Sequence, residues 1–314
     1  MVANASPAET ALPAPPRGSR WRAPGTGGRW AALAFLLPGV ALAAFTFVYP
    51  VYRLFRMSLV QTLGDFSLYV GLDNYRLVLD DPLFRTSVRN NLLLMASVPV
   101  MIAIALFFAT LLYEQRNAAP LYRFLLFTPY VISIPVSGIA FSAMLTRNGA
   151  VNQLLEAVGL GALQRDWLGD PKLALVSVGL VLVWRECVLG IVLFVARMLS
   201  LSSEPMEAAM VDGATRWRAH RDIMLPQLSG IIGFFAVTSV ITVAVWTFSY
   251  VFVMTNGGPG NATMTADLYI YQSAFATAQM NLAASAAVLV LAAAVLVAAA
   301  AAVAPRLAKA GSGR

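Results

Sequence analysis

Six long apolar runs constrain this chain more than any other feature of its sequence. Each is long enough to cross the hydrocarbon core of a bilayer, which takes about 20 residues of helix. Charged residues make up only 12% of the 314 residues, whereas a soluble domain carries about 25%. The runs predict membrane spans at residues 30–51, 92–112, 121–145, 173–199, 228–254 and 282–304.

The pattern inside the runs favours helices. Apolar residues follow one another without the alternation that a membrane β-barrel needs. Prolines fall inside the first three runs, at Pro38, Pro99, Pro129 and Pro135. Because neighbouring helices can satisfy the carbonyls that a proline frees, we expect kinks and not interruptions. The predicted fold class is an all-α membrane protein with six transmembrane helices.

The distribution of charge predicts the orientation. One side would hold the N-terminus, the loops at 113–124 and 197–227, and the C-terminus, with thirteen cations and six acids. The opposite side would hold eight of each. The whole net charge of +7 thus lies on one side, which the positive-inside rule makes cytoplasmic. Both termini are therefore expected inside, and the basic balance reflects topology and not nucleic-acid binding.

The two ends of the chain are predicted to be tails. Residues 1–29 are rich in Pro, Ala and Gly and hold four arginines, which is typical of a disordered segment, here cytoplasmic. Residues 305–314 form a short second tail on the same side. Residues 41–43 (Ala-Leu-Ala) also resemble a signal-peptidase site. Because the apolar stretch continues to about residue 51, we expect the first span to be retained. N-terminal sequencing of the mature protein would decide whether it is retained or cleaved.

The most patterned segment between two apolar runs is 204–226, EPMEAAMVDGATRWRAHRDIMLP. Ser203 is placed to cap a helix whose first turn is acidic. Gly213 permits a sharp bend, Thr215 is placed to cap a second short helix, and Pro226 is expected to end it. One apolar edge is expected from Met206, Ala209, Met210 and Gly213. Two short helices at an angle, outside the bilayer, predict a docking element.

The spacing of this segment resembles a known motif. Glu207-Ala208-Ala209, then Gly213, then Ile223-x-Leu225-Pro226 is similar to the EAA loop of permease subunits of binding-protein-dependent ABC importers. The match is specific because four separated elements fall in register over twenty residues. The resemblance implies that this loop couples to an ATPase subunit. The residues implied are Glu207, Ala208, Ala209, Asp212, Gly213, Ile223, Leu225 and Pro226.

Further matches lie outside the loop, at 71–75, 127–129, 167–171, Trp184, 256–259 and 271–275. These resemble the sugar-uptake branch, which includes the first permease subunits of maltose, trehalose and glycerol-3-phosphate importers. The similarity covers residues 30–304. Two departures are the lead-in at 199–205, which leaves the start of the first coupling helix open, and a C-terminal tail without a recognisable regulatory domain.

This resemblance implies a type I ABC importer permease in a bacterial cell membrane, with several partners. These are a second homologous permease, two copies of an ABC ATPase, an extracytoplasmic solute-binding protein and membrane lipid. ATP and Mg would belong to the ATPase, because the chain has no Walker-type motif. No cofactor or metal is expected on this chain, which has one Cys and one His.

Two charges near the middle of the fourth span, Arg185 and Glu186, are candidates for the solute pathway. A charge there costs at least about 2.5–3.5 kcal/mol on insertion scales, so both should face a partner or a water-filled cavity. Neighbouring residues point about 100° apart on a helix, so both cannot face one narrow path. Pairing with another helix or with the second permease is the equally weighted alternative.

Aromatic and amide side chains extend the candidate pathway. Trp246, Tyr250 and Tyr130 have the apolar faces that stack on sugar rings, although such residues more often pack or form an interfacial belt. Asn256 begins a Gly-rich turn that would shape the mouth of the cavity or contact the binding protein, or simply cap the fifth helix.

Other functions are less well supported by the residues. An importer of polyamines, metals or peptides would use a similar coupling loop, and the outer-loop matches argue against it. A proton-coupled carrier would need several buried acids or histidines, and among them only Glu186 qualifies. A membrane enzyme would need clustered polar catalytic groups, which the spans lack.

Overall fold

The computed structural model describes residues 26–63, 66–114 and 119–311. The chain divides into two units, Met1–Tyr52 and Arg53–Arg314. Most of the predicted N-terminal tail lies outside the described residues, as does the end of the predicted C-terminal tail. In the first unit, α1 (Thr26–Ala43) continues through a π-helical turn (Ala44–Val48) into the start of α2 (Tyr49–Ser58).

The first loop of the second unit contains a small hairpin that sequence reasoning missed. Strands β1 (Val60–Leu63) and β2 (Phe66–Tyr69) pair antiparallel, with Val60 opposite Tyr69. A turn at residues 71–72 then leads into helix α3 (Asp73–Asp80). Helix α4 (Pro82–Met95) begins where the Asp81 carboxylate accepts the Leu83 N–H at 2.8 Å.

Proline positions decide where the predicted spans are broken. α4 ends at Met95 and α5 (Ser97–Glu114) begins two residues later; Pro99 cannot donate to the Met95 carbonyl, four residues back. The third predicted span is two helices, α6 (Ala119–Val131) and α7 (Ile134–Met144), because Pro135 likewise cannot donate to Val131. Our expectation of a kink in this span was wrong, since residues 132–133 are not helical.

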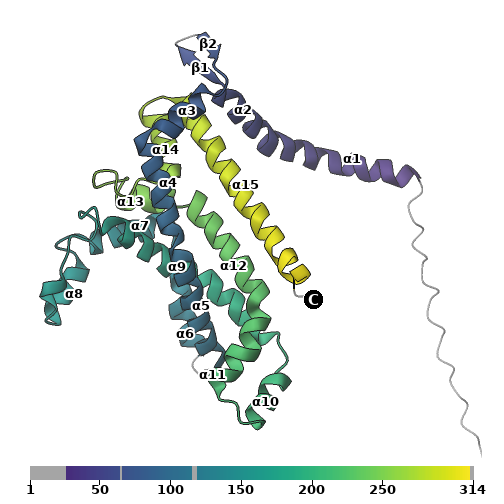
Figure 1. Ribbon diagram of the computed structural model, residues 1–314, viewed down its shortest axis with the longest axis vertical. Helices are drawn as coiled ribbons and strands as arrows, with labels where there is room; N and C mark the ends of the chain where they lie inside the picture. The colour runs from purple at the N-terminus through teal and green to yellow at the C-terminus, as the bar shows by residue number, and fades with distance from the viewer. Residues whose placement is uncertain (1–25, 64–65, 115–118, 312–314) are drawn as a thin grey trace, which may run out of the picture. The chain divides into compact units, whose positions relative to one another are not determined.

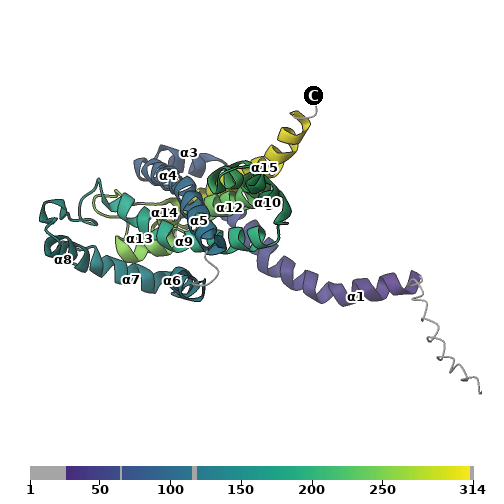
Figure 2. The same cartoon turned by 90° about the horizontal axis from the view of Figure 1, so that it is seen from below.

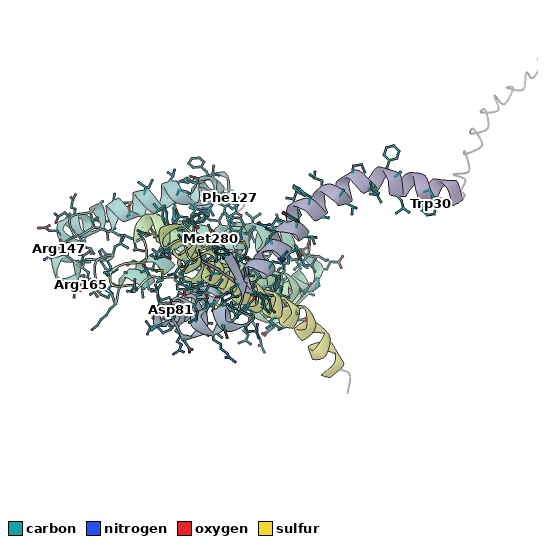
Figure 3. The ribbon with its side chains drawn as sticks, turned by 90° about the horizontal axis from the view of Figure 1, so that it is seen from above. Trp30, Asp81, Phe127, Arg147, Arg165 and Met280 are labelled. Carbon is teal, nitrogen blue, oxygen red and sulfur yellow. The ribbon has the colours of Figure 1, made fainter. Side chains whose placement is uncertain are left out.

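Among the described residues, five helices are long and apolar enough to cross a membrane. The broken α6–α7 segment is not one of them. Beyond it lie α8 (Ala150–Ala157) and a 3₁₀ turn (Gly161–Leu163). Asn152 donates to the carbonyls of Arg147 and Arg165 at 2.9 and 2.7 Å and so closes this loop. Figure 3 shows Arg147 and Arg165 near one another. Figure 2 shows α6, α7 and α8 following one another along one edge of the second unit.

Helix α9 (Ala174–Leu199) is the centre of the second unit and packs along α5 (Figure 1). The close approach depends on Gly190. A Cβ at that position would lie 2.7 Å from the Phe235 ring and 2.8 Å from Ala105. Phe194 and Phe235 meet edge to face with ring centroids 5.6 Å apart. The buried core is therefore formed where α5, α9 and α12 converge.

The remaining elements run from the candidate docking segment to the C-terminus. They are α10 (Glu204–Val211), α11 (Arg216–Ala219), a π-helical turn (His220–Met224), α12 (Leu225–Val245), α13 (Phe248–Met254), α14 (Ala266–Tyr271), a second π-helical turn (Gln272–Ala276) and α15 (Met280–Gly311). The fifth predicted span is thus α12 and α13, separated at residues 246–247.

Pro226 does not end a helix, contrary to our expectation. The π-helical turn before it carries the chain from α11 into α12 without a break, and the Leu225 N–H donates to His220 O, five residues back. The wider turn accommodates a residue that has no N–H to donate. Pro50 follows the π-helical turn of the first unit at the same spacing, where the Tyr49 N–H donates to Ala44 O.

Two buried asparagines hold α4 against the chain that follows α12. Asn90 donates to the carbonyls of Ala262 and Met264 at 3.0 and 2.9 Å. Asn91 donates to Val243 O at 3.2 Å and accepts the Ala266 N–H at 2.9 Å. Because backbone groups at helix ends lack intrahelical partners, these amides replace the hydrogen bonds lost where α12 ends and α14 begins.

Candidate functional site

The predicted docking segment is a helical hairpin of α10 and α11. Thr215 caps α11 as expected, with its hydroxyl accepting the Arg218 N–H at 3.3 Å. Ser203 makes no capping bond; the hydroxyl of Ser202 accepts the Glu204 N–H at 3.3 Å instead. The chain turns at Gly213, whose φ of +86° lies in the left-handed region, which glycine adopts at little cost.

The apolar edge predicted for α10 is divided between two surroundings. Met206 is partly buried and packs on the core, whereas Met210 is 44% exposed. Val211 and Trp217 are 87% and 75% exposed. Exposed large apolar side chains on a short hairpin are typical of a surface that binds another protein. We call Met210, Val211 and Trp217 the loop face.

The residues of the EAA-like motif lie on or beside this hairpin. Glu207, Ala208 and Asp212 are exposed, and Ala209 is half-buried. Among the described residues, a Cβ at Gly213 would meet nothing within 4 Å, so only the backbone conformation favours a glycine there. The later members of the motif lie at the π-helical turn and the start of α12: Ile223 is half-buried, and Leu225 and Pro226 are exposed.

One polar contact ties the hairpin to the end of α5. His220 Nδ1 lies 2.8 Å from Arg216 O, and its Nε2 lies 3.5 Å from a carboxylate oxygen of Glu114. The His220 side chain is only 14% exposed. Sequence reasoning assigned this histidine no role beyond structure, and the contact places it between the hairpin and the membrane helices.

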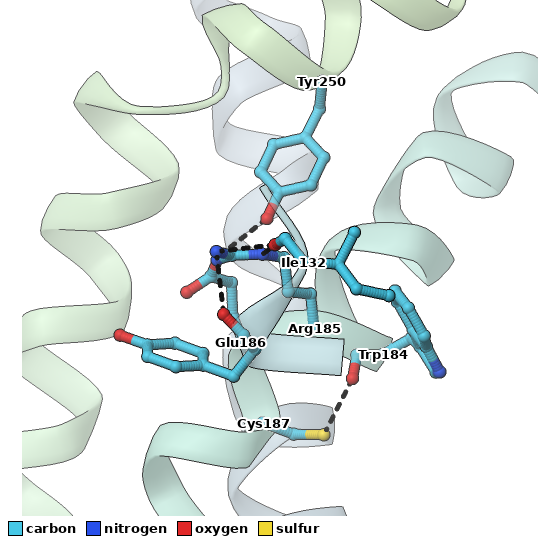
Figure 4. Close-up of polar contacts among 7 residues, drawn as sticks. Ile132, Trp184, Arg185, Glu186, Cys187 and Tyr250 are labelled. Atoms are coloured by element: carbon cyan, nitrogen blue, oxygen red, sulfur yellow. Dashed lines mark hydrogen bonds and ion pairs between the residues drawn. The ribbon is translucent and has the colours of Figure 1, made fainter. Parts of the chain in front are cut away.

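The fourth-span charges pair with each other. Arg185 Nη1 donates to Glu186 Oε1 at 2.8 Å, and the two side chains are 12% and 13% exposed (Figure 4). Tyr250 of α13 donates its hydroxyl to the same carboxylate oxygen at 2.6 Å. The Arg185 guanidinium also lies 5.0 Å from the centre of the Tyr130 ring, within the range of a cation–π contact.

The same guanidinium reaches the break between α6 and α7. Its Nε and Nη2 lie 3.4 Å from Ile132 O, and Nη2 lies 3.4 Å from Tyr130 O. These carbonyls stand at the end of α6, where the next turn of helix is absent. Four of the six predicted pathway residues, Arg185, Glu186, Tyr250 and Tyr130, therefore form one cluster at a helix break.

The other two predicted pathway residues lie elsewhere. Trp246 is 64% exposed at the break between α12 and α13. Asn256 has a φ of +49°, and its N–H donates to Val251 O at 2.7 Å. Asn256 thus closes the end of α13, which is the capping role weighed as an alternative.

The structure adds three polar residues that sequence reasoning missed. Thr238, Ser239 and Thr242 of α12 line a small cavity beside Glu186, with a volume of about 10 Å³, which is room for about one water molecule. Their spacing of one, three and four residues within an apolar run was a readable signal of one polar helix face. They extend the polar surroundings of Glu186 away from the helix break.

The described geometry is that of a multi-pass helical membrane protein with a polar cluster between its helices and an exposed helical hairpin. Among the described residues, no three His, Cys, Asp or Glu side chains are grouped so as to hold a metal ion. Residues 81–309 match the family described as "Binding-protein-dependent transport system inner membrane component". The chain belongs to this family of transport permeases, and it is a multi-pass protein of the cytoplasmic membrane.

Sequence similarity to other transport permeases extends over most of the chain. The lactose transport system permease protein LacF of Rhizobium radiobacter is 31% identical over 77% of this chain and 82% of its own length. The sulfoquinovosyl glycerol transport system permease protein SmoG of Agrobacterium fabrum is 30% identical over 82% of this chain and 84% of its own. A chain of a bacterial ABC transporter that imports alginate shares the fold, with a TM-score of 0.77, 22% identity, and coverage of 89% and 96%.

Proposed function

We propose that this protein is the permease subunit of an ATP-driven importer for a carbohydrate or a related solute, such as a disaccharide or a glycerophosphate. Family membership supports the transport role. The relatives named for lactose and sulfoquinovosyl glycerol support the solute class, as do the outer-loop motifs. A permease for a polyamine, metal or peptide is the alternative within the family.

The exposed hairpin is the observation that carries the coupling mechanism. The loop face would enter a groove on a separate ATPase, in the manner of a short helix bound through its apolar side. Glu207 would pair with a basic group there, and the open space around Gly213 would let the partner's surface approach the backbone. Closure of two ATPase copies would then shift the membrane helices between inward-open and outward-open states.

The polar cluster would lie beside the solute pathway. Arg185 and Glu186 compensate each other, and Tyr250 and Tyr130 present aromatic rings next to them. Hydroxyls of a sugar can bond with such charged groups while its apolar ring faces stack on tyrosine. Trp246 and Asn256 would act further from the cluster, if they contact the solute.

The assembly needs partners, because one chain carries one coupling hairpin. We infer a second homologous permease, two copies of an ABC ATPase and an extracytoplasmic solute-binding protein, all within membrane lipid. ATP and Mg would bind the ATPase, and this chain would be a non-catalytic subunit without a cofactor. The net positive charge predicts that the hairpin and both termini are cytoplasmic.

Uptake by reconstituted vesicles tests this proposal. Glu207→Lys should abolish ATP-dependent uptake while the protein still inserts and its partner subunits are present. Glu204→Lys is the matched control, because it reverses an exposed charge in the same first turn of α10 and should leave most of the uptake. Equal uptake in both variants would remove the docking role, and uptake without ATP would indicate a secondary carrier.

A further inference from the structure

A groove between α4–α5 and α9 has features that the transport role does not use. Its volume is about 420 Å³. One wall follows Arg89, Leu93, Ser97 and Val100, and the other follows Lys172, Val176, Leu180 and Val183. The groove therefore has a basic residue at the same end of both walls and mainly apolar side chains below.

The two walls have the same spacing. Counted from its basic residue, each wall contributes the positions four, eight and eleven residues later. Val176, Leu180 and Val183 share one face of α9, with Lys172 in the turn just before that helix, and the other wall passes from α4 to α5 at Ala96. Gly179 lies at the floor, where a Cβ would stand 3.4 Å from Leu94, so the absence of a side chain keeps the groove open.

The length of the walls matches one leaflet of a bilayer. Eleven residues of helix rise about 16 Å, and half of the hydrocarbon core is about 15 Å thick. Leu93, Val176 and Leu180 are 56%, 59% and 62% exposed. An acyl chain lying along them would reach the middle of the membrane while its headgroup stayed beside Arg89 and Lys172.

The charges at the open end have no acidic partner among the residues that the structure describes. Within the part that the structure describes, neither Arg89 nor Lys172 forms an ion pair. Arg76 and Arg85, in the same outer region, are paired with Asp73 and Asp80 at 3.9 and 2.8 Å.

The acid nearest to Lys172 in the sequence, Asp170, forms a hydrogen bond with the backbone. Asp170 accepts the backbone N–H of Lys172 at 2.8 Å. Among the described residues, the groove therefore presents two positive charges without an ion-pair partner, which an anion from outside the chain can complement.

A second groove along α4 serves as an internal comparison. It lies between Val88, Leu92 and Met95 on one wall and Val240 and Val297 opposite, and no charged residue lines it. Both grooves are apolar along the membrane, but only the first of the two also has a basic end.

We propose that the groove between α4–α5 and α9 binds one anionic phospholipid, with its phosphate between Arg89 and Lys172 and an acyl chain along Leu93, Val176 and Leu180. Basic pockets between transmembrane helices bind anionic headgroups. Each basic residue near an anionic lipid contributes about a fivefold increase in affinity, so the pair contributes about 30-fold.

Native mass spectrometry of the assembled transporter tests the site, with titration of phosphatidylglycerol and of phosphatidylcholine that has the same acyl chains. The wild-type complex should prefer phosphatidylglycerol by at least about tenfold. The double variant Arg89→Gln/Lys172→Gln should lose about 30-fold in phosphatidylglycerol affinity and leave phosphatidylcholine unchanged. Arg76→Gln/Arg165→Gln makes the same change in net charge outside the groove and should keep the preference.

A second pair of variants tests the acyl-chain part without changing charge. Val176→Trp would fill the groove and should reduce phosphatidylglycerol binding at least about tenfold. Val192→Trp, on an exposed part of α9 that does not line the groove, should leave binding unchanged. Equal binding of the two lipids overturns the proposal. So does a disulfide between Val176→Cys and the second permease, which would assign the groove to a protein interface.

Discussion

Replacing Arg185 with methionine should destabilise the protein mainly through the charge it leaves behind. Glu186 is 13% exposed, and removing one member of a buried ion pair costs about 3–5 kcal/mol. The Tyr250 hydroxyl would remain on Glu186 at 2.6 Å, and a hydrogen bond to a charged group contributes about 1.5–3 kcal/mol. The backbone contacts that Arg185 loses are 3.4 Å long and so add little. We therefore expect a cost near the lower limit, about 3 kcal/mol.

A double variant separates the orphaned charge from simple loss of packing. Arg185→Met/Glu186→Gln removes both charges and leaves an amide oxygen at position 186 that can still accept from Tyr250. Because a buried pair replaced as a unit is often neutral, the double variant should be within about 1 kcal/mol of the wild type. The coupling between the two substitutions should therefore exceed about 2 kcal/mol.

The assay compares unfolding of the wild type, both single variants and the double variant in one detergent, followed by intrinsic tryptophan fluorescence. Uptake is measured on the same four proteins in vesicles. Additive destabilisation would refute the idea that each charge compensates the other. Normal solute affinity and rate in Arg185→Met would separately remove Arg185 from the solute pathway.

Three further predictions concern other parts of the second unit. Gly213 has a φ of +86°, which strains Ala by about 1 kcal/mol, whereas Asn is larger but accepts that conformation. If a partner approaches the backbone closely, Gly213→Asn should therefore lower uptake more than Gly213→Ala. The reverse order would show that only the backbone conformation matters. Burial raises the pKa of Asp267 above its ordinary value, so the folded state binds the proton more tightly and its stability falls as pH rises above about 4. Asp267→Asn should therefore raise the melting temperature at pH 7, and this gain should shrink towards pH 4. A gain in melting temperature that does not depend on pH would contradict the argument. Asn91→Leu should cost about 1–3 kcal/mol in chemical denaturation, because the Ala266 N–H loses its partner while Val243 O keeps the Thr247 hydroxyl. A cost below about 1 kcal/mol would mean that water replaces the amide.

Periodicity and caps predicted the parts of the fold that depend on local chemistry. Five of the six apolar runs coincide with helices long enough to cross a membrane, and the Gly213 bend and the Thr215 cap are present in the hairpin. These features need only the side chains of a few neighbouring residues. The pairing of β1 with β2 was missed because its short strands lack a clear alternation.

The effect of proline depended on contacts that the sequence does not give. Pro135 ends a helix, whereas Pro226 lies within one. In the first case the Arg185 guanidinium lies beside the exposed carbonyls, and in the second a π-helical turn absorbs the missing donor. Both outcomes are compatible with proline's chemistry.

The contacts within the polar cluster could not be predicted from the sequence either. Arg185 and Glu186 were recognised as needing partners, but their partners were found only in the fold. The hydroxyl of Tyr250 comes from a helix 64 residues away in sequence, and adjacent side chains converge despite their separation of about 100° around the helix. Neither contact follows from local periodicity.

The helix that continues through the π-helical turn has a mechanical consequence. Residues Arg216–Val245 form one helical segment of 30 residues, about 45 Å long. If this segment rotates as a rigid rod about its Trp217 end, a rotation of about 5° displaces the Val243 end by about 3 Å. A displacement of that size would break the 3.2 Å hydrogen bond between Asn91 and Val243, so a modest tilt of this segment would release a polar contact between α12 and α4.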